Sequence, residues 1–85
     1  MALKEFFGET CPHCIAMKPL VEQLEKELGV TVEKHEVWNN EENAKEAEAL
    51  DKGVCGGVPF FINTETNARI CGSCDYEELK KWATG

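Results

Sequence analysis

The sequence predicts an α/β fold in which a four-stranded mixed sheet is flanked by three helices, in the order β-α-β-α-β-β-α. The strand segments 3–8 and 30–37 are separated by a helical segment, 12–28, so they should run parallel through a right-handed crossover. The strand segments 58–63 and 68–71 are separated by a short turn, so they should run antiparallel. Helices packed on both faces of the sheet follow from this order.

Length and charge limit the classes of function. The chain has 85 residues, enough for one small domain, and we expect residues 1–85 to form it. Its net charge of −7 leaves no basic stripe, so we expect no binding to nucleic acid or to an anionic membrane surface. The first residues lack the basic region and long apolar stretch of a signal peptide, and no apolar run is long enough to span a membrane. We expect a monomer in the cytoplasm, where thiols are kept reduced.

The helices carry recognisable start and stop signals. The helix 12–28 should end at Gly29, and its inward face repeats at three- and four-residue spacings. Asn39 followed by Glu42 has capping-box spacing, and Gly53 should end the second helix. Asp75 should cap the last helix. The residues expected to face the core from the first and last helices are Met17, Leu20, Val21, Leu24, Leu28, Tyr76, Leu79, Trp82 and Ala83.

Two thiols lie at the start of the first helix. Pro12 fits the first helical position, which makes Cys11 the N-cap, and Cys14 follows one turn along. Backbone N–H groups and the helix dipole stabilise a thiolate at that position. We therefore expect Cys11 to be exposed and reactive, with Cys14 within reach of it. His13 adds a positive charge or a hydrogen-bond donor and should tune the acidity of the Cys11 thiol.

Three further cysteines leave alternatives open. Cys55, Cys71 and Cys74 all fall in or beside predicted loops, and Cys71 and Cys74 form a second C-x-x-C. They could be inert thiols, or Cys71 and Cys74 could form a second redox pair. Cys71 and Cys74 could also join Cys11 and Cys14 in a four-thiolate metal site, since soft thiolates bind zinc or iron–sulfur clusters. The chain would then be a metal-binding module.

The order of motifs resembles the thioredoxin superfamily, and in length the chain is most similar to a glutaredoxin. The resemblance covers nearly the whole sequence and is carried by three motifs. These are Cys11-Pro12-His13-Cys14 with Pro19 beyond it, Val58-Pro59, and Gly72-Ser73-Cys74-Asp75. It implies a thioredoxin-like fold of the glutaredoxin type.

The resemblance also implies roles for residues. Cys11 would be the nucleophile and Cys14 the resolving thiol, with Pro12 and His13 between them. Val58 and Pro59, joined by a cis peptide bond, would hold the substrate backbone. The remaining substrate-binding residues would be Gly72, Ser73 and Asp75.

The expected activity is thiol–disulfide exchange on protein or low-molecular-weight disulfides, with an external reductant and no resident cofactor. Glutaredoxins commonly carry a lysine three residues before the nucleophile, where it binds the glutathione carboxylate, and this chain has Gly8 there. Glutathione is therefore left open as a co-substrate.

Overall fold

The computed structural model describes residues 3–84, and its helices and strands follow one another in the predicted order. The elements are β1 (Leu3–Phe7), α1 (Pro12–Leu28), β2 (Val32–Glu36), α2 (Glu41–Asp51), β3 (Phe60–Asn63), β4 (Arg69–Cys71) and α3 (Tyr76–Thr84). Within residues 3–84, none of the helices is long and apolar enough to cross a membrane.

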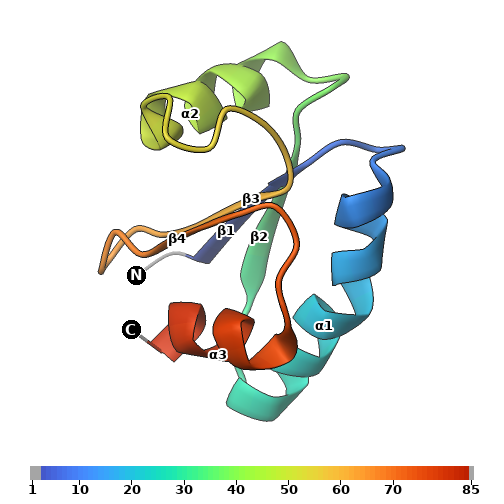
Figure 1. Cartoon of the computed structure of the whole chain (residues 1–85), viewed down its shortest axis with the longest axis vertical. Helices are drawn as coiled ribbons and strands as arrows, with labels where there is room; N and C mark the ends of the chain where they lie inside the picture. The colour runs from blue at the N-terminus through green and yellow to red at the C-terminus, as the bar shows by residue number, and fades with distance from the viewer. Residues whose placement is uncertain (1–2, 85) are drawn as a thin grey trace.

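The four strands form one mixed sheet in the order β2-β1-β3-β4. Strand β1 runs parallel to β2 and antiparallel to β3, and β4 is antiparallel to β3. Helix α2 covers one face of the sheet, and α1 and α3 cover the other (Figure 1). The predicted α/β class and mixed sheet are confirmed, and the arrangement brings the start of α1 to the end of β1.

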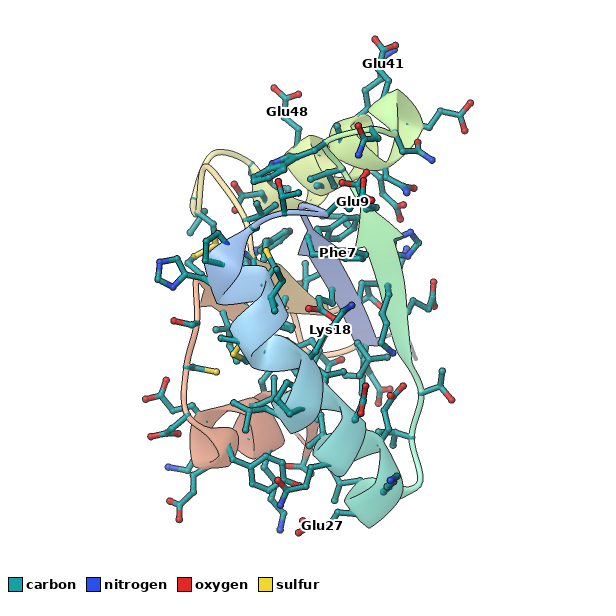
Figure 2. All side chains as sticks on the ribbon, turned by 90° about the vertical axis from the view of Figure 1, so that its right-hand side faces the viewer. Phe7, Glu9, Lys18, Glu27, Glu41 and Glu48 are labelled. Carbon is teal, nitrogen blue, oxygen red and sulfur yellow. A yellow bond between two sulfur atoms is a disulfide. The ribbon has the colours of Figure 1, made fainter. Side chains whose placement is uncertain are left out.

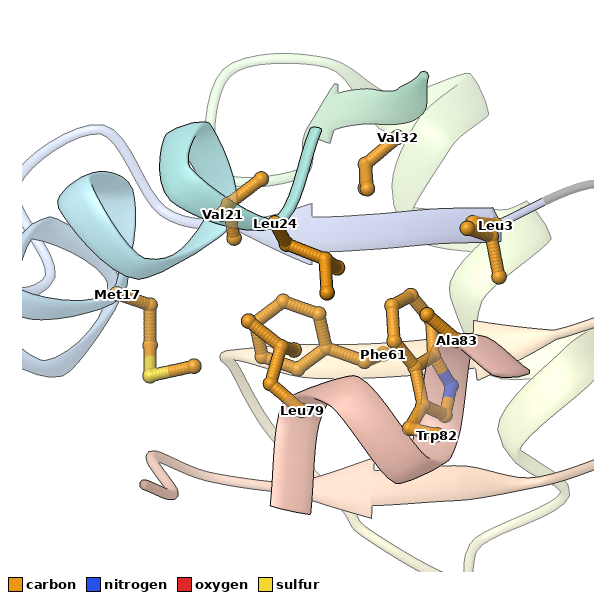
Figure 3. Close-up of a cluster of buried hydrophobic side chains, with 9 residues drawn as sticks. All are labelled: Leu3, Met17, Val21, Leu24, Val32, Phe61, Leu79, Trp82 and Ala83. Atoms are coloured by element: carbon orange, nitrogen blue, oxygen red, sulfur yellow. The ribbon is translucent and has the colours of Figure 1, made fainter. Parts of the chain in front are cut away.

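The larger part of the core lies between the sheet, α1 and α3 (Figure 3). The Phe61 and Trp82 rings meet edge-on there, with centroids 5.5 Å apart. Each large side chain buried in such a cluster stabilises the fold by roughly 1.5–3 kcal/mol. The buried members of this cluster are Leu3, Met17, Val21, Leu24, Val32, Phe61, Leu79, Trp82 and Ala83.

A smaller core lies on the α2 face. Successive strand residues point to opposite faces, so Phe6 and Phe60 point away from the first cluster. Their rings stack on each other with centroids 5.6 Å apart. The same alternation puts Glu5 on the α1 face of the sheet, between Leu3 and Phe7. A carboxylate is thus built into an otherwise apolar layer.

Two predicted boundaries of α2 were wrong by one residue. Asn40, not Asn39, is the N-cap, and its Oδ1 accepts a hydrogen bond from the backbone N–H of Asn43, 3.0 Å away. Asn39 is held outside the helix because its N–H donates to Glu36 Oε1 at 2.7 Å. At the other end, Lys52 rather than Gly53 is the left-handed cap, with φ of 54°.

Other boundaries follow backbone chemistry. Strand β3 begins at Phe60 and not at Val58, because Pro59 has no N–H to give to a ladder. Asp75 caps α3 as predicted, with its Oδ1 accepting from the N–H of Glu78 at 2.9 Å. Gly29 ends α1 in a left-handed conformation, also as predicted.

Candidate active site

The site begins at the N-terminus of α1. Cys11 is the N-cap, and its Sγ accepts a hydrogen bond from the backbone N–H of Cys14 at 3.2 Å. The N–H of Cys11 donates to the carbonyl of Gly8 at 3.1 Å, which ties the helix start to the turn after β1. A sulfur in this place meets one of the free N–H groups of the helix, an interaction that favours its anionic form.

The expected exposure of Cys11 was wrong. The residue is only 5% exposed, because its sulfur turns back over the first turn of α1 to meet the Cys14 N–H and does not point into solvent. Pro12 and His13 are exposed beside it. The rim of this turn, formed by Pro12 and His13, is therefore its solvent-exposed part.

Cys14 has the opposite character. It is a free thiol, 3% exposed, and burial together with its hydrogen bond to Cys11 raises its pKa to about 12. It therefore keeps its proton at neutral pH. The two thiols differ chemically, since one accepts a hydrogen bond from a helix N–H and the other is a buried neutral donor.

A buried carboxyl group lies behind Cys14. Glu5 is 3% exposed and lines, with Cys14, Lys18 and Lys34, a cavity of about 100 Å³ between β1 and α1. In Figure 2, Lys18 extends from α1 beside the strands. Burial, the largest cause, raises the pKa of Glu5 to about 7 against the opposing charge of Lys34. The group can therefore accept and return a proton near neutral pH.

Sequence reasoning missed Glu5. The signal was available, because the alternation of β1 puts a charged residue between the inward-facing Leu3 and Phe7.

The remaining cysteines form neither the Cys71–Cys74 redox pair nor the four-thiolate metal site considered from the sequence. Cys55 and Cys71 form a disulfide with a Cα–Cα distance of 5.2 Å, so Cys71 is not paired with Cys74. Cys71 sits opposite Phe60 in the β3–β4 ladder, next to the loop that begins at Cys55. The alternative in which Cys71 and Cys74 form a second redox pair is therefore not assembled in this structure.

Cys74 is a free, half-buried thiol that packs against the main core. Burial, followed by the negative charges of Glu78 and Asp75, raises its pKa to about 11. It therefore stays protonated at neutral pH and is a poor nucleophile.

The four-thiolate alternative is also not assembled. Cys71 is committed to its disulfide and cannot be a thiolate ligand in this state. In the described part of the chain, no three or more Cys, His, Asp or Glu side chains converge as metal ligands would. The set Cys11, Cys14, Cys71 and Cys74 is therefore not brought together.

The loop before β3 lies against the segment after β4. The Val58–Pro59 peptide bond is cis, and the Pro59 carbonyl accepts a hydrogen bond from the N–H of Gly72 at 2.8 Å. Gly72 has φ of 80°, which favours glycine. Ser73 and Asp75 are exposed before α3. The two predicted substrate-binding segments, Val58 with Pro59 and Gly72 with Ser73 and Asp75, are thus joined by a direct contact.

Gly8 faces the ring of Trp38. A Cβ added to Gly8 would lie 2.3 Å from a carbon of that ring, so no larger residue fits without moving the tryptophan. Trp38 itself is 54% exposed. Sequence reasoning did not single out Trp38, although an exposed tryptophan beside a reactive turn is an unusual use of the residue.

Neither family models nor curated proteins give a match to this chain. The site combines an N-capping sulfur, a protonated thiol one turn away and a buried carboxyl group whose pKa is raised to about 7.

Proposed function

We propose that this protein is a thiol–disulfide oxidoreductase that works through Cys11 and Cys14 on a thioredoxin-like scaffold of the glutaredoxin type. The observation that carries the proposal is the hydrogen bond from the Cys14 N–H to Cys11 Sγ at the start of α1. It supports Cys11 as the nucleophile, because a helix N-terminus favours the thiolate. The high pKa of Cys14, about 12, supports its role as the second, resolving thiol.

In the first step the Cys11 thiolate attacks one sulfur of a substrate disulfide. A bond forms between Cys11 Sγ and that sulfur while the substrate S–S bond breaks, and the departing thiolate takes a proton from solvent. The intermediate is a mixed disulfide between the protein and the substrate. His13, exposed beside the attacking sulfur, can stabilise negative charge during this step.

In the second step Cys14 gives its proton to the carboxylate of Glu5 and attacks Cys11 Sγ. The Cys11–Cys14 disulfide forms, and the second substrate thiolate leaves and takes up a proton. The substrate has then gained two electrons and two protons. A thiol reductant, for which glutathione is one candidate, returns the protein to its dithiol form. We place this cycle in the cytoplasm, where such reductants are abundant.

The test is to trap the intermediate in Cys14→Ser with 5,5′-dithiobis(2-nitrobenzoate) as the disulfide. We expect one covalent adduct per protein, carried by Cys11 and located by peptide mass mapping. Cys11→Ser is the matched control and should lose that adduct. An adduct found mainly on Cys74, or none at all, would contradict the proposed nucleophile.

A further inference from the structure

A groove of about 440 Å³ lies between α2 and the loop that leads into β3. Its apolar surface comes from both sides of the opening and from the sheet beneath, and includes Trp38, Ala47, Val58 and Phe60. Because Trp38 is half exposed, its ring offers a free aromatic surface to whatever enters. A flexible aliphatic chain would bury apolar area here.

The charged residues that line the groove are all acidic. Glu48 and Asp51 are its only charged lining residues, and no lysine or arginine lines it. None of the ion pairs within residues 3–84 involves either carboxylate. Glu48 projects from α2 into solvent (Figure 2). Asp51 is buried, so the exposed carboxylate on the groove is that of Glu48. A negatively charged ligand would be repelled, and a cation would meet the Glu48 carboxylate and the face of an indole.

The groove is held in shape by several contacts. The Asp51 carboxylate accepts hydrogen bonds from the N–H groups of Cys55 and Gly56 at 2.6 and 2.8 Å. The Cys55–Cys71 disulfide ties the same loop to β4. The wall formed by residues 56–58 is thus fixed before a ligand arrives, which lowers the entropic cost of binding.

The groove is also next to the dithiol. Trp38 packs on Gly8, and the Gly8 carbonyl accepts the hydrogen bond from the Cys11 N–H. On the other side, Val58 precedes Pro59 in the loop that contacts Gly72. An extended residue spans roughly 3.3 Å. The groove is thus connected, through Trp38 and Gly8, to the turn that leads into Cys11, and a polypeptide bound at Cys11 could extend toward it.

We propose that the groove binds a lysine or arginine side chain next to the reacting cysteine of a polypeptide disulfide. The methylene stem would lie on the apolar surface, and the charged end would meet the indole of Trp38 and the carboxylate of Glu48. This inference rests on the proposed oxidoreductase function and names its substrate class: cationic polypeptide disulfides, in preference to anionic ones such as glutathione disulfide.

The experiment measures reduction of three peptide disulfides that differ at one residue next to the cysteine, which is arginine, citrulline or glutamate. Citrulline has the shape of arginine without its charge. We expect kcat/KM to fall roughly three- to tenfold from arginine to citrulline, and further to glutamate, at low salt. The preference for arginine over citrulline should shrink as ionic strength rises.

Glu48→Gln should remove most of the preference for arginine, whereas Glu65→Gln, at the far end of β3, makes the same change in net charge and should keep it. Trp38→Leu should lower activity toward the arginine and citrulline peptides together, with the fold checked by circular dichroism. Equal rates for all three peptides, or equal effects of the two glutamate changes, would overturn the groove assignment and leave the oxidoreductase function standing. No reduction of any of the peptides would overturn both.

Discussion

The two pairs of cysteines in this molecule differ in bonding state and in surroundings. Cys11 and Cys14 are free thiols one helical turn apart, with a helix N–H on one sulfur and a titratable carboxyl group behind the other. Cys55 and Cys71 join a loop to a strand as a disulfide, and Cys71 is exposed. Spacing alone does not separate a reactive pair from a structural one. In the mechanism proposed here, the helix N–H on Cys11 and the carboxyl group of Glu5 distinguish them.

The largest expected difference between the pairs is in activity. Cys11→Ser should reduce disulfide reduction to the background rate, because no other described thiol has a helix N–H on its sulfur. The double variant Cys55→Ala with Cys71→Ala should keep the rate on a small aromatic disulfide within about threefold, since the pair supplies no reacting atom. The measurement is turnover with dithiothreitol as reductant.

If the double variant lost activity as completely as Cys11→Ser while remaining folded, the second pair would take part in electron transfer. The contrast between a reactive and a structural pair would then fail.

The next largest effect on activity is expected from replacing Glu5, which lines a cavity with Cys14. Replacing it with glutamine should slow resolution of the mixed disulfide roughly 10- to 100-fold, because Cys14 loses its proton acceptor. In the unmodified protein the resolution rate should fall as pH drops below about 7, the pKa of Glu5, and this dependence should vanish in the variant. Stopped-flow measurement of product release follows the step.

The control is Glu9→Gln, which removes an exposed carboxylate from the rim of the same cavity.

The stability of the fold should change with pH in the opposite direction to the resolution rate, so lowering the pH should stabilise the folded state. An acid whose native pKa is raised favours the folded state when protonated, so its contribution is complete below pH 4.5 and is lost as pH rises through about 7. The difference corresponds to roughly 3 kcal/mol, which Glu5→Gln should recover at pH 8. An unchanged pH profile in Glu5→Gln would remove Glu5 from the mechanism.

The smallest expected effect is on the free energy of unfolding, to which only the Cys55–Cys71 pair should contribute through a covalent bond. Removing the Cys55–Cys71 disulfide, which spans 16 positions, should lower the free energy of unfolding by about 3 kcal/mol. Urea unfolding of the double variant measures this. Cys74→Ala is the comparison, because it removes a half-buried thiol that has no covalent partner. A loss no larger than that of Cys74→Ala would mean that the disulfide adds little constraint.

Much of the fold could be predicted from the sequence, because helix periodicity, Pro12 at a helix start and the short turn between β3 and β4 are local signals. The dithiol could be predicted for the same reason. The pairing of Cys55 with Cys71 could not, since it depends on how a loop lies against a distant strand. Choosing Asn40 over Asn39 as a cap depended likewise on Glu36 capturing the Asn39 N–H.

The contact between Gly8 and Trp38 has a consequence for how such a site can change. Both positions compete for one volume, so a lysine at position 8 would displace the indole at position 38 from its present place. A lysine at position 8 that bound an anionic thiol substrate would require the indole at position 38 to be displaced or replaced first or at the same time. Substitutions at positions 8 and 38 should therefore be coupled, and a lysine introduced alone at position 8 would disturb the contact with Trp38.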